Sequence, residues 1–220
     1  MRELKSALIS IGIGFLISVP IVRMATDSWN QETKSIFEEI PDYQIITSDE
    51  IERKAHEIME AEKKRQELID QELMRQERIE QEIQAEYILE HYAVIVPEDV
   101  RVYCDRAQEE SNVCAELLEA VCWRESRFDD RAKNSGCLGM MQISTKWHED
   151  RMKRLGVTDI YDPEENIRVG ADYLAELFER FDGDVYKVLM TYNGDSSEGV
   201  SDYAIEICEV AAALERVHGK

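Results

Sequence analysis

Glycine and proline, the residues that interrupt regular secondary structure, are scarce. The 220-residue sequence contains 10 glycines and 4 prolines, and none of them lies between Pro41 and Pro97. All-β sandwiches and barrels need many glycine- or proline-containing turns between short strands, so this scarcity argues against them. No stretch shows the alternation of apolar and polar residues that is typical of a half-buried strand. The sequence therefore predicts an all-α fold, α+β at most.

Positive charge is also in short supply. Lysine and arginine number 26 against 47 aspartates and glutamates, which gives a formal net charge of −21. A nucleic-acid binder needs a basic surface that neutralises phosphates, so we expect no nucleic-acid partner. Charged residues nevertheless make up 33% of the chain, above the roughly 25% of a typical globular domain. Part of the chain is therefore expected to be mostly solvated.

The sequence lacks the pattern of a metal site. It has no C-x-x-C pair, and its four histidines are scattered at His56, His91, His148 and His218. Because structural zinc needs four closely spaced sulfur or nitrogen ligands, no metal is expected.

Five cysteines lie in the C-terminal part of the chain: Cys104, Cys114, Cys122, Cys137 and Cys208. An odd number leaves at least one of them unpaired within the chain. Cys122 lies on an apolar helical stripe and is interpreted as a core residue rather than a nucleophile. In an oxidising compartment Cys104 could bridge to Cys114, or Cys137 to a neighbour, and the connectivity stays open.

The first 25 residues have the pattern of a membrane anchor. Positive charges at Arg2 and Lys5 precede an uncharged apolar run from Ser6 to Val22, which is close to the shortest length that spans a bilayer. A cleaved signal peptide is the alternative, but Arg23-Met24-Ala25 lacks the small residues of a cleavage site. We expect residues 1–25 to form a single-pass anchor, with the rest of the chain outside the cytoplasm by the positive-inside rule.

Residues 26–96 are expected to hold a juxtamembrane segment followed by a long charged helical stalk. Strong helix formers dominate from Glu50 to Glu90, and Thr47 with Glu50 forms a capping-box pattern. Apolar residues recur at helical spacing, but Arg65 and Glu72 occupy positions where a coiled coil needs apolar side chains. A solvated spacer is the favoured interpretation. A self-associating or partner-binding helix is the alternative.

Residues 97–220 have the pattern of a compact helical domain. Pro97-Glu98-Asp99 and Asp162-Pro163-Glu164-Glu165 are typical helix starts. Apolar residues at helical spacing from Leu117 to Cys122 predict a buried helix, and a last helix runs from about Ala204 to Leu214. The stretch from Cys137 to Ile143 is compatible with strand or loop.

Glu125 is the candidate general acid. It lies four residues after Val121 and three after Cys122, so it continues the buried face of its helix. Burial disfavours the charged form of a carboxyl group and raises its pKa, as a glycosidase requires of the acid that protonates a leaving oxygen. A structural salt bridge to Arg124 or Arg127 is the alternative interpretation.

Three sequence blocks around this residue occur in a fixed order: Trp123-Arg124-Glu125-Ser126-Arg127-Phe128, Gly139-Met140-Met141-Gln142-Ile143 and Thr191-Tyr192-Asn193-Gly194. They resemble the lytic transglycosylase family related to the soluble transglycosylase (SLT) catalytic domain and to goose-type lysozyme, which reads E-S, then G-L-M-Q-I, then Y-N. The segments at Asp162-Pro163 and Ser201-Asp202-Tyr203-Ala204 are similar to two further blocks. The resemblance covers residues 97–215 and implies that residues 97–220 form a lysozyme-like catalytic domain.

The resemblance implies a role for each matched position. Glu125 matches the single acid/base of the family, which cleaves the β-1,4 bond between N-acetylmuramic acid and N-acetylglucosamine and closes a 1,6-anhydro ring. Met141 and Gln142 match positions that line the substrate groove, with core packing as the alternative for Met141. Tyr192 and Asn193 match the pair near the acid, where the phenol can orient it. The substrate-contacting serine of the family maps loosely onto Ser135.

Three departures from the family pattern concern the site. The segment from Asn134 to Leu138 is shorter than the common version, so the match of Ser135 is loose. Met140 replaces the usual leucine, a volume-conserving change that is expected to be harmless. Gly194 and Asp195 follow Tyr192-Asn193 where the family has a small residue and a glycine, which is expected to alter the loop.

The sequence therefore predicts a murein lytic transglycosylase of the bacterial cell membrane that acts on peptidoglycan glycan strands and requires no cofactor. A hydrolytic lysozyme with the same acid is one alternative. A non-catalytic glycan-binding scaffold is the other, and the joint presence of Glu125, Gln142, Tyr192 and Asn193 argues against it.

Overall fold

The computed structural model describes residues 47–196 and 199–219. The anchor predicted at residues 1–25, and the start of the following segment up to residue 46, lie outside this range. Within the range, no helix combines the length and the apolar character needed to cross a membrane. The chain divides into two units, Met1–Glu72 and Leu73–Lys220.

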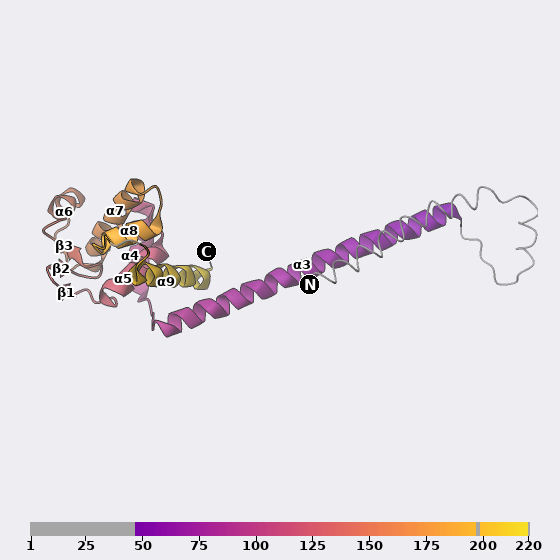
Figure 1. The fold of residues 1–220 in the computed structure, drawn as a ribbon, viewed down its shortest axis with the longest axis horizontal. Coiled ribbons are helices and arrows are strands. Elements are labelled where there is room, and N and C mark those ends of the chain that lie inside the picture. The colour runs from indigo at the N-terminus through magenta and orange to yellow at the C-terminus, as the bar shows by residue number, and fades with distance from the viewer. Residues whose placement is uncertain (1–46, 197–198, 220) are drawn as a thin grey trace, which may run out of the picture. The chain divides into compact units, whose positions relative to one another are not determined.

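The predicted long charged helix is α3, which spans Ser48–His91 (Figure 1). Thr47 caps it as the sequence predicts, because its Oγ1 accepts a hydrogen bond of 3.3 Å from the backbone N–H of Glu50. Ion pairs at i, i+4 spacing, such as Arg53 with Glu57 at 3.1 Å, support the exposed helix. The helix ends where Ala93 adopts a left-handed conformation with φ of 51°.

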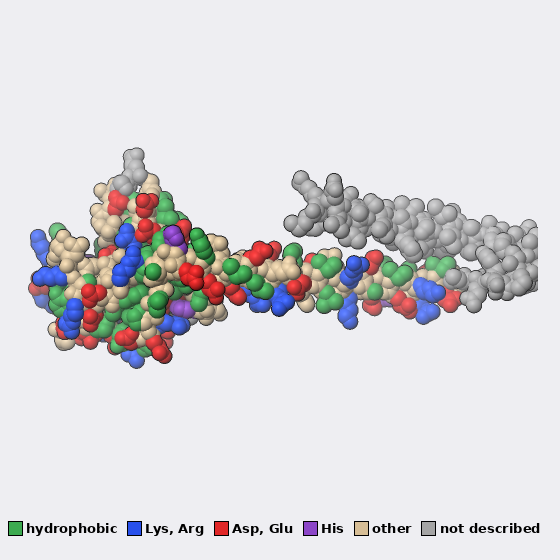
Figure 2. Space-filling model, turned by 90° about the horizontal axis from the view of Figure 1, so that it is seen from below, with side chains coloured by type: hydrophobic (Ala, Val, Ile, Leu, Met, Phe, Trp, Pro, Cys, Tyr) green, Lys and Arg blue, Asp and Glu red, His purple; other side chains and the backbone are tan. Residues whose placement is uncertain are grey.

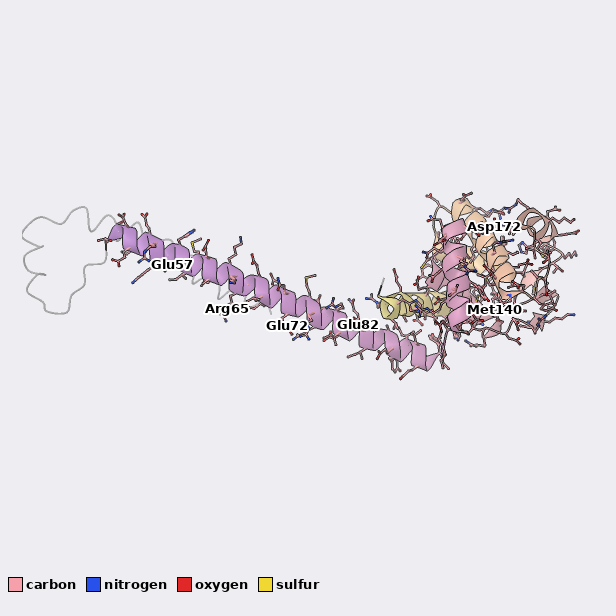
Figure 3. All side chains as sticks on the ribbon, turned by 180° about the vertical axis from the view of Figure 1, so that it is seen from behind. Glu57, Arg65, Glu72, Glu82, Met140 and Asp172 are labelled. Atoms are coloured by element: carbon pink, nitrogen blue, oxygen red, sulfur yellow. The ribbon has the colours of Figure 1, made fainter. Side chains whose placement is uncertain are left out.

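The surface of α3 mixes charged and apolar side chains (Figure 2). The large apolar residues Ile58, Leu68, Ile69, Ile79 and Ile83 are each 41–61% exposed. Arg65 and Glu72 are exposed and stand out from the helix (Figure 3). In the second unit the helix is attached to its surroundings: Ala85 is buried, and Gln81 accepts a hydrogen bond of 2.5 Å from Arg216.

The second unit is mostly helical, as predicted. Its helices are α4 (Glu98–Ser111), α5 (Ala115–Ser126), α6 (Glu149–Leu155), α7 (Pro163–Arg180), α8 (Val185–Tyr192) and α9 (Asp202–His218). The start predicted at Asp162-Pro163 is confirmed, since the Asp162 carboxylate accepts a hydrogen bond of 2.9 Å from the N–H of Glu165. The short helices α6 and α8 were not identified in the sequence.

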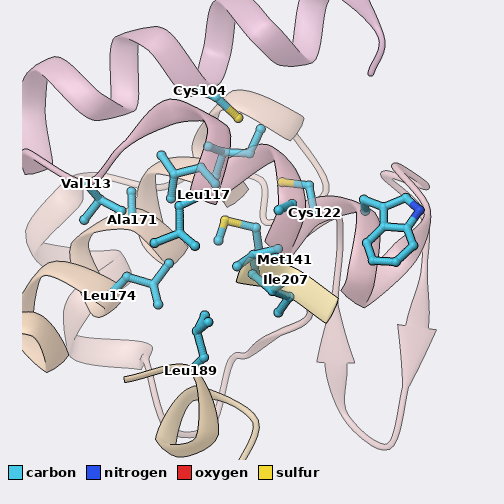
Figure 4. Close-up of a cluster of buried hydrophobic side chains, with 14 of the residues drawn as sticks. Cys104, Val113, Leu117, Cys122, Met141, Ala171, Leu174, Leu189 and Ile207 are labelled. Carbon is cyan, nitrogen blue, oxygen red and sulfur yellow. The ribbon is translucent and has the colours of Figure 1, made fainter. Parts of the chain in front are cut away.

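Helix α5 forms the centre of the core. All nine residues from Ala115 to Trp123 are buried, because α4 and α9 both pack against this helix and α7 packs against α4 and α5. Figure 4 shows Leu117 and Cys122 of α5 among side chains from α4, α7, α8 and α9. Seven of these nine residues are apolar, which favours burial of the helix on all sides, and the other two are Glu116 and Glu119.

The burial of α5 extends to a carboxylate. Glu116 is 1% exposed, and its Oε1 lies 3.2 Å from Nδ1 of His218 at the end of α9. Its Oε2 accepts a hydrogen bond from the Cys114 thiol at 3.0 Å. These contacts join the last turn of the domain to the first turn of its central helix.

The ambiguous stretch from Cys137 to Ile143 contains two short strands and a loop. Strands β1 (Lys133–Asn134), β2 (Cys137–Leu138) and β3 (Ile143–Ser144) form a three-stranded antiparallel sheet. The turn between β1 and β2 has positive φ at both central residues, 52° at Ser135 and 91° at Gly136. That geometry is a tight two-residue hairpin turn, which fixes the pairing of Asn134 with Cys137.

All five cysteines are free, so the structure contains neither candidate disulfide. Cys104 and Cys122 are completely buried in the same core cluster, and a hydrogen bond to Cys122 helps to raise the pKa of the Cys104 thiol. Cys104 therefore packs against Cys122 rather than Cys114. The core interpretation of Cys122 is confirmed.

Candidate active site

Glu125 lies in the last turn of α5 and is half-buried. The helix ends immediately after it, where Arg127 and Phe128 both adopt left-handed conformations with φ of 57° and 64°. Such conformations are costly for residues with a side chain and need support from the surrounding structure. They end the helix directly after the carboxyl group, and Phe128 packs against the core.

The pKa of Glu125 is raised. Burial is the largest cause, whereas the hydrogen bond from Tyr203 and the charge of Arg124 act in the opposite direction. The expected desolvation of this carboxyl is found, and it acts in the predicted direction, towards a higher pKa. No other carboxylate in the part of the chain that the structure describes perturbs this group.

The salt-bridge alternative for Glu125 is not what the structure contains. Arg124 lies 2.7 Å from a carboxylate oxygen of Glu206 on α9. The guanidinium of Arg127 lies over the ring of Trp123, 3.9 Å from its centroid. Both arginines that could neutralise the acid therefore have other partners.

Tyr203 is the direct partner of the acid, and sequence reasoning assigned it no role. It is buried near the start of α9, and its hydroxyl donates a hydrogen bond of 2.5 Å to Oε1 of Glu125. The one signal that pointed to it was its place in the Ser201–Ala204 block.

Tyr192, which was expected to orient the acid, bonds to a different group. Its hydroxyl, at the end of α8, donates a hydrogen bond of 2.8 Å to the backbone carbonyl of Met141. It lies close enough to Glu125 for that carboxylate to contribute to the raised pKa of the phenol, although burial is the larger cause. Asn193 caps α8 and is exposed.

One buried side-chain amide, that of Asn166 on α7, fixes the loop from Gly139 to Gln142. Asn166, completely buried on α7, accepts a hydrogen bond of 2.8 Å from the N–H of Met141. It also donates to the carbonyls of Leu138 and Ile160 at 3.0 and 2.9 Å. All of its side-chain groups are thereby satisfied, which is what makes a buried amide tolerable.

The two predicted groove residues in this loop lie differently. The side chain of Met141 is completely buried, close to Gly170 on α7, so it belongs to the core beneath the site. Gln142 is half-buried with φ of 49°. Its Nε2 donates to the carbonyl of Gly139 at 2.9 Å, which fixes the direction of the amide.

Ser135 is exposed in the β1–β2 turn and its hydroxyl donates to the Asn134 side chain at 3.0 Å. Cys137, two residues further along, is half-buried. Burial and the nearby Glu125 carboxylate raise the pKa of its thiol. Cys137 is thus the residue of the sheet that lies near the Glu125 carboxylate. In residues 47–196 and 199–219 there is no cluster of three or more metal-ligating side chains.

Parts of the chain are similar to known transglycosylases. Residues 102–199 match the family model of the transglycosylase SLT domain. A peptidoglycan transglycosylase of Escherichia phage T7, gp16, is 38% identical over 113 residues, which are 48% of this chain and 8% of that protein. A membrane-bound lytic murein transglycosylase F 2 of Alkalilimnicola ehrlichii is 39% identical over 77 residues, 34% of this chain and 16% of that protein.

The chain thus spans less than a fifth of the length of either relative. The crystal structure of the lytic transglycosylase Slt of Pseudomonas aeruginosa superimposes with a TM-score of 0.43 and 20% identity, over 55% of this chain and 24% of that chain. The residues matched by the family model include Glu125, the 139–142 loop and Tyr192. Residues 102–199 are thus similar to a transglycosylase SLT domain.

Proposed function

We propose that this protein is a peptidoglycan lytic transglycosylase whose lysozyme-like domain, residues 97–220, uses Glu125 as its single acid and base. The observation that carries the proposal is the half-buried Glu125 carboxyl with a raised pKa, at the edge of the loop and helices that match the SLT domain.

In the proposed reaction Glu125 first donates its proton to the glycosidic oxygen between N-acetylmuramic acid and N-acetylglucosamine. The resulting carboxylate then takes the proton of the muramoyl 6-hydroxyl, whose oxygen attacks the anomeric carbon and closes the 1,6-anhydro ring. No water is consumed and Glu125 ends protonated, as it began. This cycle needs one carboxyl group, whereas the usual glycosidase mechanism needs two.

The other residues bind or orient. Tyr203 holds the Glu125 carboxyl in place and, as a donor, stabilises its charged form between the two proton transfers. Gln142, Asn193 and Ser135 present polar groups to the substrate. Tyr192 supports the loop through the Met141 carbonyl.

We also propose that residues 1–25 anchor the chain in the cell membrane and leave the catalytic domain outside the cytoplasm. The apolar run and its flanking charges support this, and several relatives are named membrane-bound. The exposed part of helix α3 before Gln81 would act as a spacer. Self-association through its exposed apolar residues is the alternative, and sedimentation of the detergent-solubilised chain distinguishes the two.

The enzymatic proposal is tested by digesting purified peptidoglycan with the full chain and analysing the products by mass spectrometry. We expect anhydro-muropeptides from the wild type and from Glu110→Gln, which changes an exposed carboxylate on α4. Glu125→Gln should give none. Reducing-end products would indicate a lysozyme instead, and glycan binding without products would indicate a binding module.

A further inference from the structure

An exposed tryptophan lies close in sequence to the proposed site. Trp147, in the turn between β3 and α6, is 78% exposed, more than any other aromatic side chain in the described residues, whereas Trp123 is 1% exposed. The turn itself is ordered, because the N–H groups of Trp147 and His148 both donate to the carbonyl of Ser144, at 3.1 and 3.0 Å. An indole held in water on a fixed turn is an apolar surface that a ligand can cover.

Two ring contacts lead from this turn to Tyr192 on α8. His148 packs on Tyr173 of α7 with ring centroids 4.5 Å apart, and Tyr173 packs on Tyr192 of α8 at 5.5 Å. The charge of the nearby Glu125 carboxylate contributes to the raised pKa of the Tyr192 phenol, after burial. His148, Tyr173 and Tyr192 are all half-buried, so this row of rings is partly open to solvent along its length.

A lysine beside the exposed indole suits a sugar polymer that carries acidic groups. The ammonium of Lys146 lies 5.2 Å from the centroid of the Trp147 ring, and the guanidinium of Arg151 lies 5.0 Å from that of Tyr173. Arg151 is occupied by Asp172 and Glu176, whereas Lys146 is exposed. In a chain with a net charge of −21, this position offers a cation beside an aromatic face.

We propose that Trp147, on the turn whose next residue, His148, packs on Tyr173, is a glycan-stacking subsite that contacts the peptidoglycan strand at a sugar remote from the bond cleaved at Glu125. The apolar C–H face of a pyranose packs on an indole, and the acetamido and hydroxyl groups at its edge stay solvated. This inference rests on the proposed function for the identity of the glycan. It adds a second contact that an enzyme acting on a long polymer can use and one acting on a disaccharide cannot.

The test measures binding without cleavage, in the full chain carrying Glu125→Gln. The probes are glycan strands stripped of their stem peptides and, separately, intact peptidoglycan sacculi. Adding Trp147→Ala should weaken binding of the stripped strands about tenfold, the loss expected when one stacked ring is removed. Trp147→Phe should recover most of the affinity. Tyr186→Ala, which removes another exposed aromatic ring, is the matched control and should change nothing.

Kinetics in the active protein separate a subsite from a structural effect. Trp147→Ala should raise KM on long strands about tenfold and leave kcat, and cleavage of the shortest substrates, unchanged. In the binding experiment, equal affinity for the stripped strands with and without Trp147→Ala in the Glu125→Gln chain would overturn the subsite. Weaker binding of sacculi alone would overturn it as well, because the ring would then recognise the peptide. Failure of the wild type to give anhydro-products, by contrast, defeats the proposed function itself.

Discussion

The hydroxyl of Tyr203 on α9 donates a hydrogen bond to Oε1 of Glu125 at the end of α5. This bond stabilises the charged carboxylate and lowers the pKa of Glu125, whereas burial of the same group raises it by more. The two residues lie 78 positions apart and meet because α5 and α9 pack against each other. The proton affinity of the acid therefore depends on the docking of the C-terminal helix.

Removing the Tyr203 hydroxyl should move the pH profile of activity. In Tyr203→Phe the carboxylate loses its donor, so the pKa of Glu125 rises further above its ordinary value. Since the reaction begins with the protonated acid, the alkaline limb of kcat/KM should move to higher pH. We also expect roughly tenfold lower kcat, because a hydrogen bond to a charged group is worth about 1.5–3 kcal/mol. The profile is measured on soluble glycan strands.

The control for this prediction is Tyr186→Phe, which removes a hydroxyl from an exposed ring on α8. Its profile should overlay that of the wild type. A Tyr203→Phe profile with an unmoved alkaline limb, or one moved to lower pH, would show that the phenol does not tune Glu125.

The residues of the site were only partly predictable. Glu125 was found because its spacing from Val121 and Cys122 is local and the surrounding block matches a known family. Tyr203 was missed because its role depends on how α9 docks, which no local pattern encodes. The burial of Met141 depends in the same way on α7, where Gly170 leaves room for its sulfur.

The fold shows the same division between local and tertiary information. Capping residues identified the starts of α3 and α7, because a carboxylate or hydroxyl acts on an N–H three residues away. The sheet was ambiguous because its strands are two residues long and have no measurable period. Helices α6 and α8, with seven and eight residues, are likewise too short to show one.

Replacing the acid should stabilise the domain in a pH-dependent way. The folded-state pKa of Glu125 is raised above its ordinary value of 4.5, so the folded protein binds this proton more tightly than the unfolded chain. The contribution to stability is fully present below the ordinary pKa and is lost as pH rises through the folded pKa. Glu125→Gln removes this loss. Its melting temperature should exceed that of the wild type at pH 7, and the difference should shrink towards pH 4.

Glu110→Gln serves as the control, because the Glu110 carboxylate is exposed. Its difference in melting temperature from the wild type should not depend on pH in this way. A difference in melting temperature between Glu125→Gln and wild type that does not change with pH would mean that side-chain packing, not protonation of Glu125, accounts for it.

Two glycines near the site should respond very differently to alanine. Both have positive φ, 91° at Gly136 and 77° at Gly139, so each substitution costs about 1–2 kcal/mol in backbone energy. A Cβ at Gly136 would meet nothing within 4 Å, but at Gly139 it would lie 2.2 Å from Nδ2 of Asn166. That amide is held by its hydrogen bonds and cannot retreat. Urea unfolding should therefore show a loss of about 1–2 kcal/mol for Gly136→Ala and about 3 kcal/mol or more for Gly139→Ala. Similar losses in both variants would contradict the role of Asn166 as a rigid support.

Tyr192→Phe should also destabilise the loop from Gly139 to Gln142. The substitution removes the donor to the Met141 carbonyl, and an unpaired buried carbonyl costs about 1–3 kcal/mol. Urea unfolding should show a loss in this range, with Tyr186→Phe on the same helix within about 0.5 kcal/mol of wild type. Because Gln142 follows Met141 directly, we also expect weaker binding of glycan strands, with the pH profile of the residual activity less shifted than in Tyr203→Phe. An unchanged stability would mean that water replaces the phenol, and a larger pH shift than in Tyr203→Phe would make Tyr192, not Tyr203, the residue that controls the acid.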